Sequence, residues 1–258
     1  MNQVSTHDLS RWLDATLQPQ RFRDYCPNGL QVEGKDSIRH IITGVTASQA
    51  LLEAAAERGA DAVVVHHGWF WKNEDPCIRG PKRRRLALAL ENQLNLFAYH
   101  LPLDAHPTLG NNAQLARVLG FEPDRDADGN PLTCGPDGLV WLGRCRAVNS
   151  LGELGLHVNN SLHRQPLVVG NPQQPATRIA WCTGGAQSMM QAAVDAGAEV
   201  YITGEASEPT FHLAQETGCG FIAAGHHATE RYGVQALGQA IADEFGIRVE
   251  FIDLDNPI

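Results

Sequence analysis

Two adjacent histidines follow a short apolar run, and chemistry is first expected there. The run is 63–65, three valines, and His66, His67 and Gly68 come directly after it. The valines predict a buried strand. Imidazole is a common metal ligand, and two neighbouring rings can turn towards one centre where a strand gives way to a loop. The alternative for an isolated pair is one packed and one solvated histidine.

Two other parts of the sequence, far from these histidines along the chain, also contain side chains with nitrogen or oxygen atoms that can bind metal. His226 and Glu230 are four residues apart, so they share one face if a helix already begins near His226. Taken alone, Glu230 could instead be a surface residue paired with Arg231. Asp104 follows a predicted strand and a proline turn, where a turn or capping role is the alternative.

Together these groups supply three imidazoles and two carboxylates. A single metal ion with an open coordination position needs about three protein ligands. Five ligands, two of them carboxylates that can bridge, suit a pair of ions about 3.5–4 Å apart. Mixed nitrogen and oxygen donors suit Zn, Mn, Fe or Co. We therefore predict two divalent metal ions per chain with the ligands His66, His67, Asp104, His226 and Glu230.

Two other residues are predicted to support the metal ligands, and one stays open. His100 and Glu205 are candidates for orienting ligands or for transferring protons in catalysis. His227 is open to a hydrogen bond that points away from the site. The remaining histidines have no comparable neighbours in sequence.

The elements that position these residues alternate between helix and strand, which predicts an α/β fold. Helices are expected at 6–17, 48–58, 83–92, up to 119, 187–196, 210–217 and about 229–245. Strands are expected at 38–45, 62–65, 94–99, 139–148, 167–169, 179–182, 199–203, 221–224 and 248–254. Asp, Gly and Pro dominate 122–138, which indicates a linker or a long surface loop.

Residues 51–67 and 189–205 can be aligned without gaps. Their apolar positions coincide, as do the helix-ending Gly59 and Gly197 and the acidic Asp61 and Glu199. This predicts an internal duplication of an α/β unit, although alanine-rich helices can align by chance. In open α/β sheets, ligands bind at the carboxyl ends of strands, and the candidate residues follow such ends.

Composition narrows the class of protein. The chain has 258 residues, 43% of them hydrophobic, and no apolar run approaches the roughly 20 residues of a membrane span. Its N-terminal residues show no secretory signal, so we expect a cytoplasmic protein without a membrane partner. A net charge of −9 argues against broad nucleic-acid binding. Six cysteines without a Cys-x-x-Cys pair indicate buried reduced thiols.

Two clusters have more than one interpretation. The basic residues 82–85 indicate either a solvated helix face or an anion contact. Three consecutive aromatic residues, 69–71, are consistent with a wall over a pocket, a subunit contact or core packing.

Five stretches make the chain resemble the NIF3-like, YbgI family of metal-binding proteins. They are DYCPNGLQV (24–32), VHHG (65–68), HLPLD (100–104), CTGG (182–185) and GHHATER (225–231), and they run in family order over almost the whole chain. The resemblance implies a dinuclear metal site formed by His66, His67, Asp104, His226 and Glu230.

The same resemblance has implications for architecture and name. It implies two intertwined α/β units with mixed sheets, which we expect at 1–124 plus 225–258 and at 125–224. It also implies a toroidal homohexamer whose sites face an inner cavity. Family members are often named GTP cyclohydrolase 1 type 2.

Three functions are therefore considered. The first is a metal-dependent hydrolase that acts on a nucleotide or another small heterocyclic or phosphorylated compound. The second is a non-catalytic protein that handles metal or binds a ligand. The third is an oligomeric scaffold that metals only stabilise. Retained ions with turnover favour the first, exchangeable ions favour the second, and loss of assembly alone on removing a ligand favours the third.

Overall fold

The computed structural model describes residues 2–258, which form two compact units, each assembled from two stretches of chain. Unit 1 contains the residues up to Gly110 and the stretch Gly233–Asp255. Unit 2 contains Asn111–Tyr232 and the last three residues, Asn256–Ile258. The joins therefore lie at 110/111 and 232/233, rather than at the expected 124/125 and 224/225.

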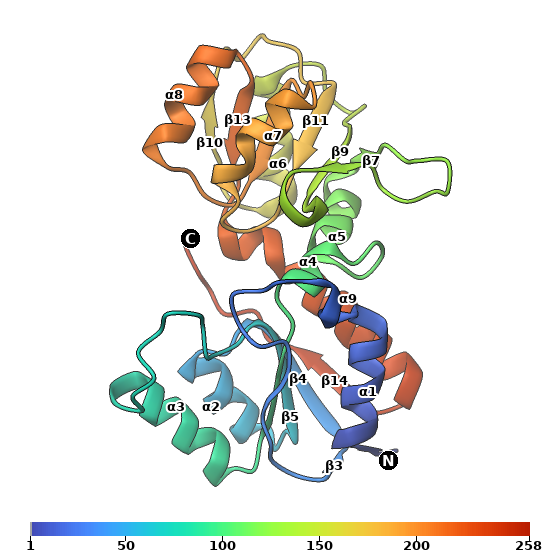
Figure 1. Cartoon of the computed structure of the whole chain (residues 1–258), viewed down its shortest axis with the longest axis vertical. Coiled ribbons are helices and arrows are strands. Elements are labelled where there is room, and N and C mark those ends of the chain that lie inside the picture. The colour runs from blue at the N-terminus through green and yellow to red at the C-terminus, as the bar shows by residue number, and fades with distance from the viewer. Residues whose placement is uncertain (1) are drawn as a thin grey trace. The chain divides into compact units, whose positions relative to one another are not determined.

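Unit 1 contains a five-stranded mixed sheet in the order β14-β4-β5-β6-β2 (Figure 1). The strands β14, β4, β5 and β6 are parallel, and β2 is antiparallel to β6. Their bounds are β14 (Arg248–Phe251), β4 (His40–Thr46), β5 (Ala62–His67), β6 (Asn95–Ala98) and β2 (Gly29–Val32). A separate antiparallel pair consists of β1 (Val4–Ser5) and β3 (Ser37–Ile38).

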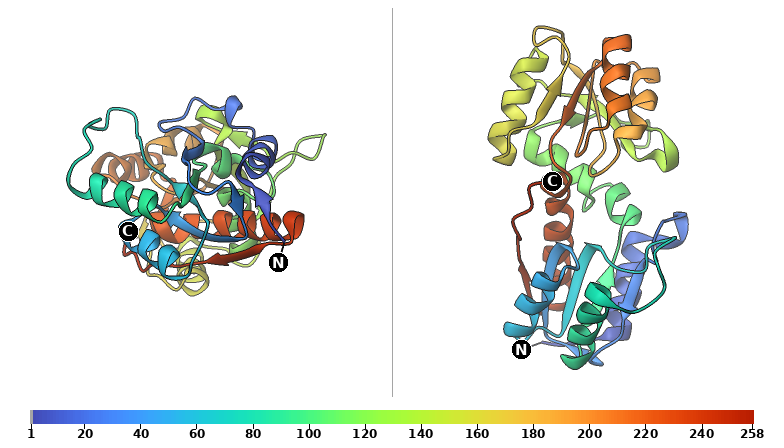
Figure 2. Two further views of the ribbon diagram at one scale, coloured as in Figure 1. Left: turned by 90° about the horizontal axis from the view of Figure 1, so that it is seen from below. Right: turned by 90° about the vertical axis from the view of Figure 1, so that its left-hand side faces the viewer.

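Helices cover both faces of this sheet, because alternate residues along its strands point to opposite sides. Val64 of β5 packs in one core with the first helix and the end of the last. Val63 and Val65 pack in a second core with the next two helices. The ribbon shows these helices on the two sides of the sheet (Figure 2). The helices of unit 1 are α1 (Thr6–Leu17), η1 (Pro19–Arg21), α2 (Gln49–Glu57), α3 (Gly80–Glu91), α4 (Leu101–Ala105) and the C-terminal part of α9 (His226–Phe245).

Unit 2 contains a seven-stranded mixed sheet in the order β10-β13-β12-β11-β9-β7, with β8 also paired to β9. The strands β11, β12 and β13 are parallel. The bounds are β7 (Glu122–Pro123), β8 (Thr133–Cys134), β9 (Val140–Arg144), β10 (Leu167–Val169), β11 (Arg178–Trp181), β12 (Val200–Thr203) and β13 (Gly220–Ala223). The helices are α5 (Asn111–Leu119), η2 (Pro136–Gly138), α6 (Leu151–Leu162), η3 (Gln187–Met189), α7 (Met190–Asp195), α8 (Glu208–Thr217) and the start of α9.

The two repeated stretches have the same local structure in their own units. Asp61 precedes β5 and its carboxylate accepts the backbone N–H groups of Arg39 and His40, at the start of the neighbouring parallel strand. Glu199 precedes β12 and accepts the N–H groups of Thr177 and Arg178 in the same way. The mixed α/β fold is therefore confirmed, while a common origin of the two units stays a prediction.

Replacing Asp61 tests the stabilising role of this acidic position. The Asp61 carboxylate also accepts from Lys35 Nζ at 2.7 Å. We expect Asp61→Ala to lower the free energy of unfolding by about 1–3 kcal/mol, because the N–H groups of exposed Arg39 and buried His40 both lose a charged acceptor. Urea unfolding measures this change, with the exposed Asp128→Ala as the control. Equal stability of the two variants would contradict the role.

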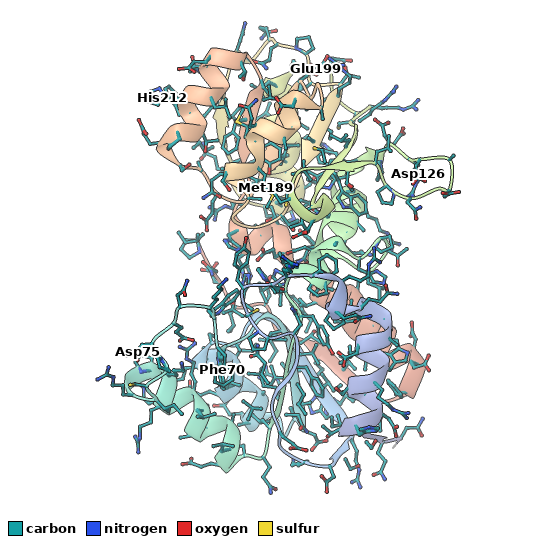
Figure 3. The ribbon with its side chains drawn as sticks, viewed as in Figure 1. Phe70, Asp75, Asp126, Met189, Glu199 and His212 are labelled. Carbon is teal, nitrogen blue, oxygen red and sulfur yellow. The ribbon has the colours of Figure 1, made fainter. Side chains whose placement is uncertain are left out.

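Several elements differ from the expectations, and the first two of them carry site residues. Helix α9 begins at His226 rather than near 229, and β5 extends to His67. The expected linker at 122–138 includes β7 and β8, both paired with β9, and Asp126 lies in the loop between them (Figure 3). Helix α6 had no counterpart among the expected elements.

The structure bears on two expectations from composition, the burial of the cysteines and the lack of a membrane-spanning segment. Cys26, Cys145, Cys182 and Cys219 are buried, but Cys77 is exposed and Cys134 is half-buried, so not every thiol is buried as expected. Within residues 2–258, no helix combines the length and apolar character that crossing a bilayer requires.

Candidate functional site

Unit 1 brings four polar side chains to the carboxyl ends of its parallel strands. His66 and His67 end β5, His100 directly precedes α4, and Asp104 lies within that helix. One ligand atom from each of His66, His67 and His100 lies within 4.8 Å of the others, a grouping that could hold a metal ion. Nε2 of His66 is 3.5 Å from Oδ1 of Asp104. Both His66 and Asp104 are buried.

All three imidazoles use Nδ1 for a hydrogen bond. His66 Nδ1 donates to the carbonyl oxygen of Tyr99 at 3.0 Å. His67 Nδ1 is 3.1 Å from the hydroxyl of Thr46, its register partner on β4. Such bonds fix the orientation of metal-binding imidazoles and direct Nε2 towards the ion. The donor chemistry and its outer hydrogen bonds therefore fit a divalent cation.

Asp24 fixes the third imidazole. Its carboxylate accepts from His100 Nδ1 at 2.7 Å, from the Leu101 backbone N–H at 2.9 Å and from the Asn28 amide at 2.9 Å. Burial opposes ionisation of Asp24, but these bonds, led by that from His100, lower its pKa to about 2. Asp24 is thus an anion that holds His100 in one orientation.

Removing the Asp24 charge is expected to cost stability in a pH-dependent way. Since the folded-state pKa lies below the unfolded value, the contribution is complete above about pH 4 and is lost as the pH falls towards 2. We expect Asp24→Asn to lower the free energy of unfolding at neutral pH by about 2 kcal/mol. Urea unfolding between neutral pH and about pH 3 tests this. A difference from wild type that does not shrink in acid would contradict it.

The three consecutive aromatic residues have different environments. Trp69 is buried in the core of unit 1, and its Nε1–H donates to the Ala47 carbonyl oxygen. Phe70 is exposed, with Lys82 5.7 Å from its ring centre, in the segment that leads to α3 (Figure 3). Trp71 is half-buried and packs against His67 and His100. Core packing therefore applies to one of the three.

Unit 2 brings three more polar side chains to the carboxyl ends of its own strands. Glu205 follows β12, and His226 follows β13 as the first residue of α9. Nε2 of His226 is 3.1 Å from Oε2 of Glu230 one turn later, so the two residues share a helix face as expected. Nδ1 of His226 is 2.7 Å from Oε1 of Glu205. Glu230 is almost fully buried, with 2% of its surface exposed.

The two carboxylates control the charge of His226. Burial acts against a charged imidazole, but Glu230 and Glu205 outweigh it and raise the pKa of His226 to about 9. At neutral pH, His226 is therefore a cation in the absence of a bound ion. A metal that binds through Nε2 must displace this proton, while Glu205 keeps hold of Nδ1.

A glycine loop shapes the space around Glu230. Gly184 has φ +70°, and a Cβ atom built there would lie 2.0 Å from Oε1 of Glu230 and 3.2 Å from Nε2 of His226. The Gly184 backbone is fixed because its N–H donates to Thr229 Oγ1 and its carbonyl oxygen accepts from Thr203 Oγ1. Only glycine leaves room for the carboxylate at this position.

The groups that gather at these strand ends were predicted from the sequence, as was Glu205 beside His226, but three other residues that orient or shape the site were not. Asp24 and Gly184 were noticed only within stretches that carry the family resemblance, and Thr46 was not noticed. Asp24 is 76 residues from His100, so no local spacing connects them. For His227, whose role the sequence left open, the backbone N–H donates to the backbone oxygen of Ile258 at 3.0 Å.

The sequence profile of the family described as Duf34/NIF3 (NGG1p interacting factor 3) matches residues 4–257. The chain belongs to this family. A Neisseria meningitidis serogroup B relative, named GTP cyclohydrolase 1 type 2 homolog, is 50% identical over 254 residues, 98% of this chain and 99% of its own. A Pseudomonas aeruginosa relative with the same name is 54% identical, over 97% of this chain and 96% of its own.

Solved structures show the same fold. One described as protein ybgI, unknown function, is 47% identical, has a TM-score of 0.92 and covers 99% of this chain and 100% of its own. A structure from Thermus thermophilus is 33% identical with a TM-score of 0.83, over 99% of this chain and 100% of its own. The NIF3-like fold and membership are therefore confirmed, and the chain carries residue groups that could bind metal ions.

Proposed function

We propose that this chain is a metal-dependent hydrolase with a dinuclear centre, acting on a nucleotide or another small heterocyclic or phosphorylated compound. The observation that carries the proposal is the outer hydrogen bonding of its imidazoles. His66 and His226, two of the proposed ligands, each have Nδ1 bonded to a carbonyl or carboxylate oxygen, as metal-site histidines usually do.

The proposed ligands are His66, His67 and Asp104 from unit 1 and His226 and Glu230 from unit 2. Their nitrogen and oxygen donors suit Zn, Mn, Fe or Co. The chemistry that two such ions supply is acidification of water and polarisation of the scissile bond. The two buried carboxylates, Asp104 and Glu230, balance the positive charge.

The chain's own residues have separate tasks in this proposal. Asp24 holds Nδ1 of His100 and leaves the opposite ring nitrogen to exchange a proton with the substrate. Glu205 holds Nδ1 of His226 and so acts as a positioning residue as well as a candidate proton acceptor. Trp71 beside His67 and His100 limits the access of water on one side.

The relatives' name, GTP cyclohydrolase 1 type 2 homolog, contains a nucleotide, GTP, and so agrees with a nucleotide substrate. The experiment is a screen of nucleotides, phosphoesters and cyclic amides with protein loaded with Mn, Zn or Fe. We expect turnover that requires metal and that falls in a His100→Gln variant which still holds metal. Protein that holds two ions and turns over none of these classes would favour metal handling instead.

We also propose that the chain assembles into a ring-shaped homohexamer. Unit 2 exposes Leu156, Leu167 and Phe211, and large exposed apolar side chains on neighbouring elements are common at subunit contacts. Light scattering of purified protein is expected to give six times the mass of one chain. A monomer at micromolar concentration would contradict this assembly.

A further inference from the structure

Tyr25 and Trp71 form an aromatic wall beside the imidazoles of unit 1. The ring centre of Trp71 lies 5.0 Å from that of His100 at 83°, and 5.9 Å from that of His67. The ring centre of Tyr25 lies 6.5 Å from that of His100 at 62°. Both aromatic rings thus meet the same imidazole nearly edge to face.

Hydrogen bonds fix the backbone of Tyr25, whose side chain is 60% exposed, and the ring of Trp71. The carbonyl oxygen of Tyr25 accepts the N–H of Lys72 at 2.6 Å, which ties it to the residue after Trp71. Nε1 of Trp71 donates to the Gly68 carbonyl oxygen at 3.2 Å. Asp24, the residue before Tyr25, accepts hydrogen bonds from the Asn28 amide and the Leu101 N–H.

An aromatic ring that stays exposed to water contributes little to the stability of the fold, but it can contribute to the affinity for a ligand. Burial of either ring by a ligand removes apolar surface from water, and for Trp71 little conformational entropy is lost because a hydrogen bond already positions its ring. Phe70 differs, because its exposed ring packs against Trp69 and Lys82. The wall is therefore a feature of the site and not of the whole aromatic run.

We propose that Tyr25 and Trp71 bind a planar heteroaromatic ring of the substrate, such as a nucleobase. This inference rests on the proposed function, because it chooses among the substrate classes left open there. Aromatic side chains stack on any base through its π-face, so recognition depends on the ring rather than on a phosphate. Compounds that carry phosphate without a ring are then poor ligands.

Calorimetric titration of the full-length, metal-loaded chain tests the proposal with guanosine, adenosine, cytidine, GTP and ribose 5-phosphate as probes. We expect at least one nucleoside to bind, and ribose 5-phosphate to bind at least about tenfold more weakly than that nucleoside. Trp71→Ala and Tyr25→Ala are expected to weaken nucleoside binding by about 5- to 150-fold, the range that stacking on one aromatic residue supplies. Trp71→Phe keeps a ring and is expected to retain most of the affinity.

Phe70→Ala is the matched control, because it removes a neighbouring exposed ring. Tyr25→Ala removes a mostly exposed side chain, so a melting curve like that of wild type is expected to show that the variant is folded. Absence of binding by every nucleoside, equal binding of ribose 5-phosphate, or wild-type affinity in both alanine variants would overturn the proposal.

The metal content of each variant separates this test from the test of the hydrolase. If the protein holds its ions but binds no aromatic ring, the proposed role of Tyr25 and Trp71 is wrong and the metal centre still stands. If the protein binds nucleosides through Trp71 but retains no ions, the proposed role of the aromatic wall stands and the proposed metal centre is wrong.

Discussion

Glu230→Gln is expected to weaken metal binding by more than about 100-fold, since even the loss of an outer hydrogen-bond partner costs a metal site 10- to 100-fold. The change keeps the shape of a side chain that is 2% exposed, but replaces a charged ligand with an amide. It also removes the carboxylate oxygen 3.1 Å from His226 Nε2. Metal analysis after dialysis against a graded chelator series measures the effect.

Glu244→Gln is the matched control for this variant. Glu244 lies on the same helix, α9, and is exposed, so the same chemical change there leaves the site intact. We expect this control to hold as much metal as wild type. If Glu230→Gln holds as much as Glu244→Gln does, Glu230 is not a ligand.

Gly184→Ala is expected to damage the same site without changing any proposed ligand. The added Cβ would lie 2.0 Å from Oε1 and 3.0 Å from Cδ of Glu230. Because Thr229 and Thr203 fix the Gly184 backbone, the carboxylate has to move. We expect at least about a tenfold loss of metal affinity, in line with a disturbed outer contact.

A second glycine provides a control for the conformational free energy that Gly184→Ala costs the backbone. Gly218 has φ +72° against +70° at Gly184, and a Cβ there would meet nothing within 4 Å. Both variants therefore carry the left-handed penalty of about 1–2 kcal/mol, which thermal or urea unfolding reports. Only Gly184→Ala should lose metal. Equal metal affinity in the two variants would show that Glu230 tolerates the displacement or does not bind the ion.

The sequence predicted the strands and helices that carry the site because their signals are local. Helix 6–17 has apolar residues at helical spacing, and Ser5 accepts the N–H of Asp8 as its cap. The valines of β5 alternate between two cores, which explains why the whole run is apolar. The start of α9 was harder to locate, because His226 follows a glycine with φ +101° and has no conventional capping residue before it.

The supporting contacts of the site could not be predicted from one sequence, because they join distant residues. Asp24 bonds to His100 and Leu101 across more than 70 positions, and no periodicity reports such a pair. The role of Gly184 depends on the position of Glu230, 46 residues later in the chain. Asp61 and Glu199 are an exception, since alignment of the two repeated stretches already paired them.

The most direct test of the metal centre is a crystal structure of metal-loaded protein with anomalous scattering recorded at the absorption edge of the bound element. We predict two peaks about 3.5–4 Å apart, coordinated by His66, His67, Asp104, His226 and Glu230. Peaks bound by other side chains, a single peak, or no peak in protein that elemental analysis shows to be metal-loaded would contradict it.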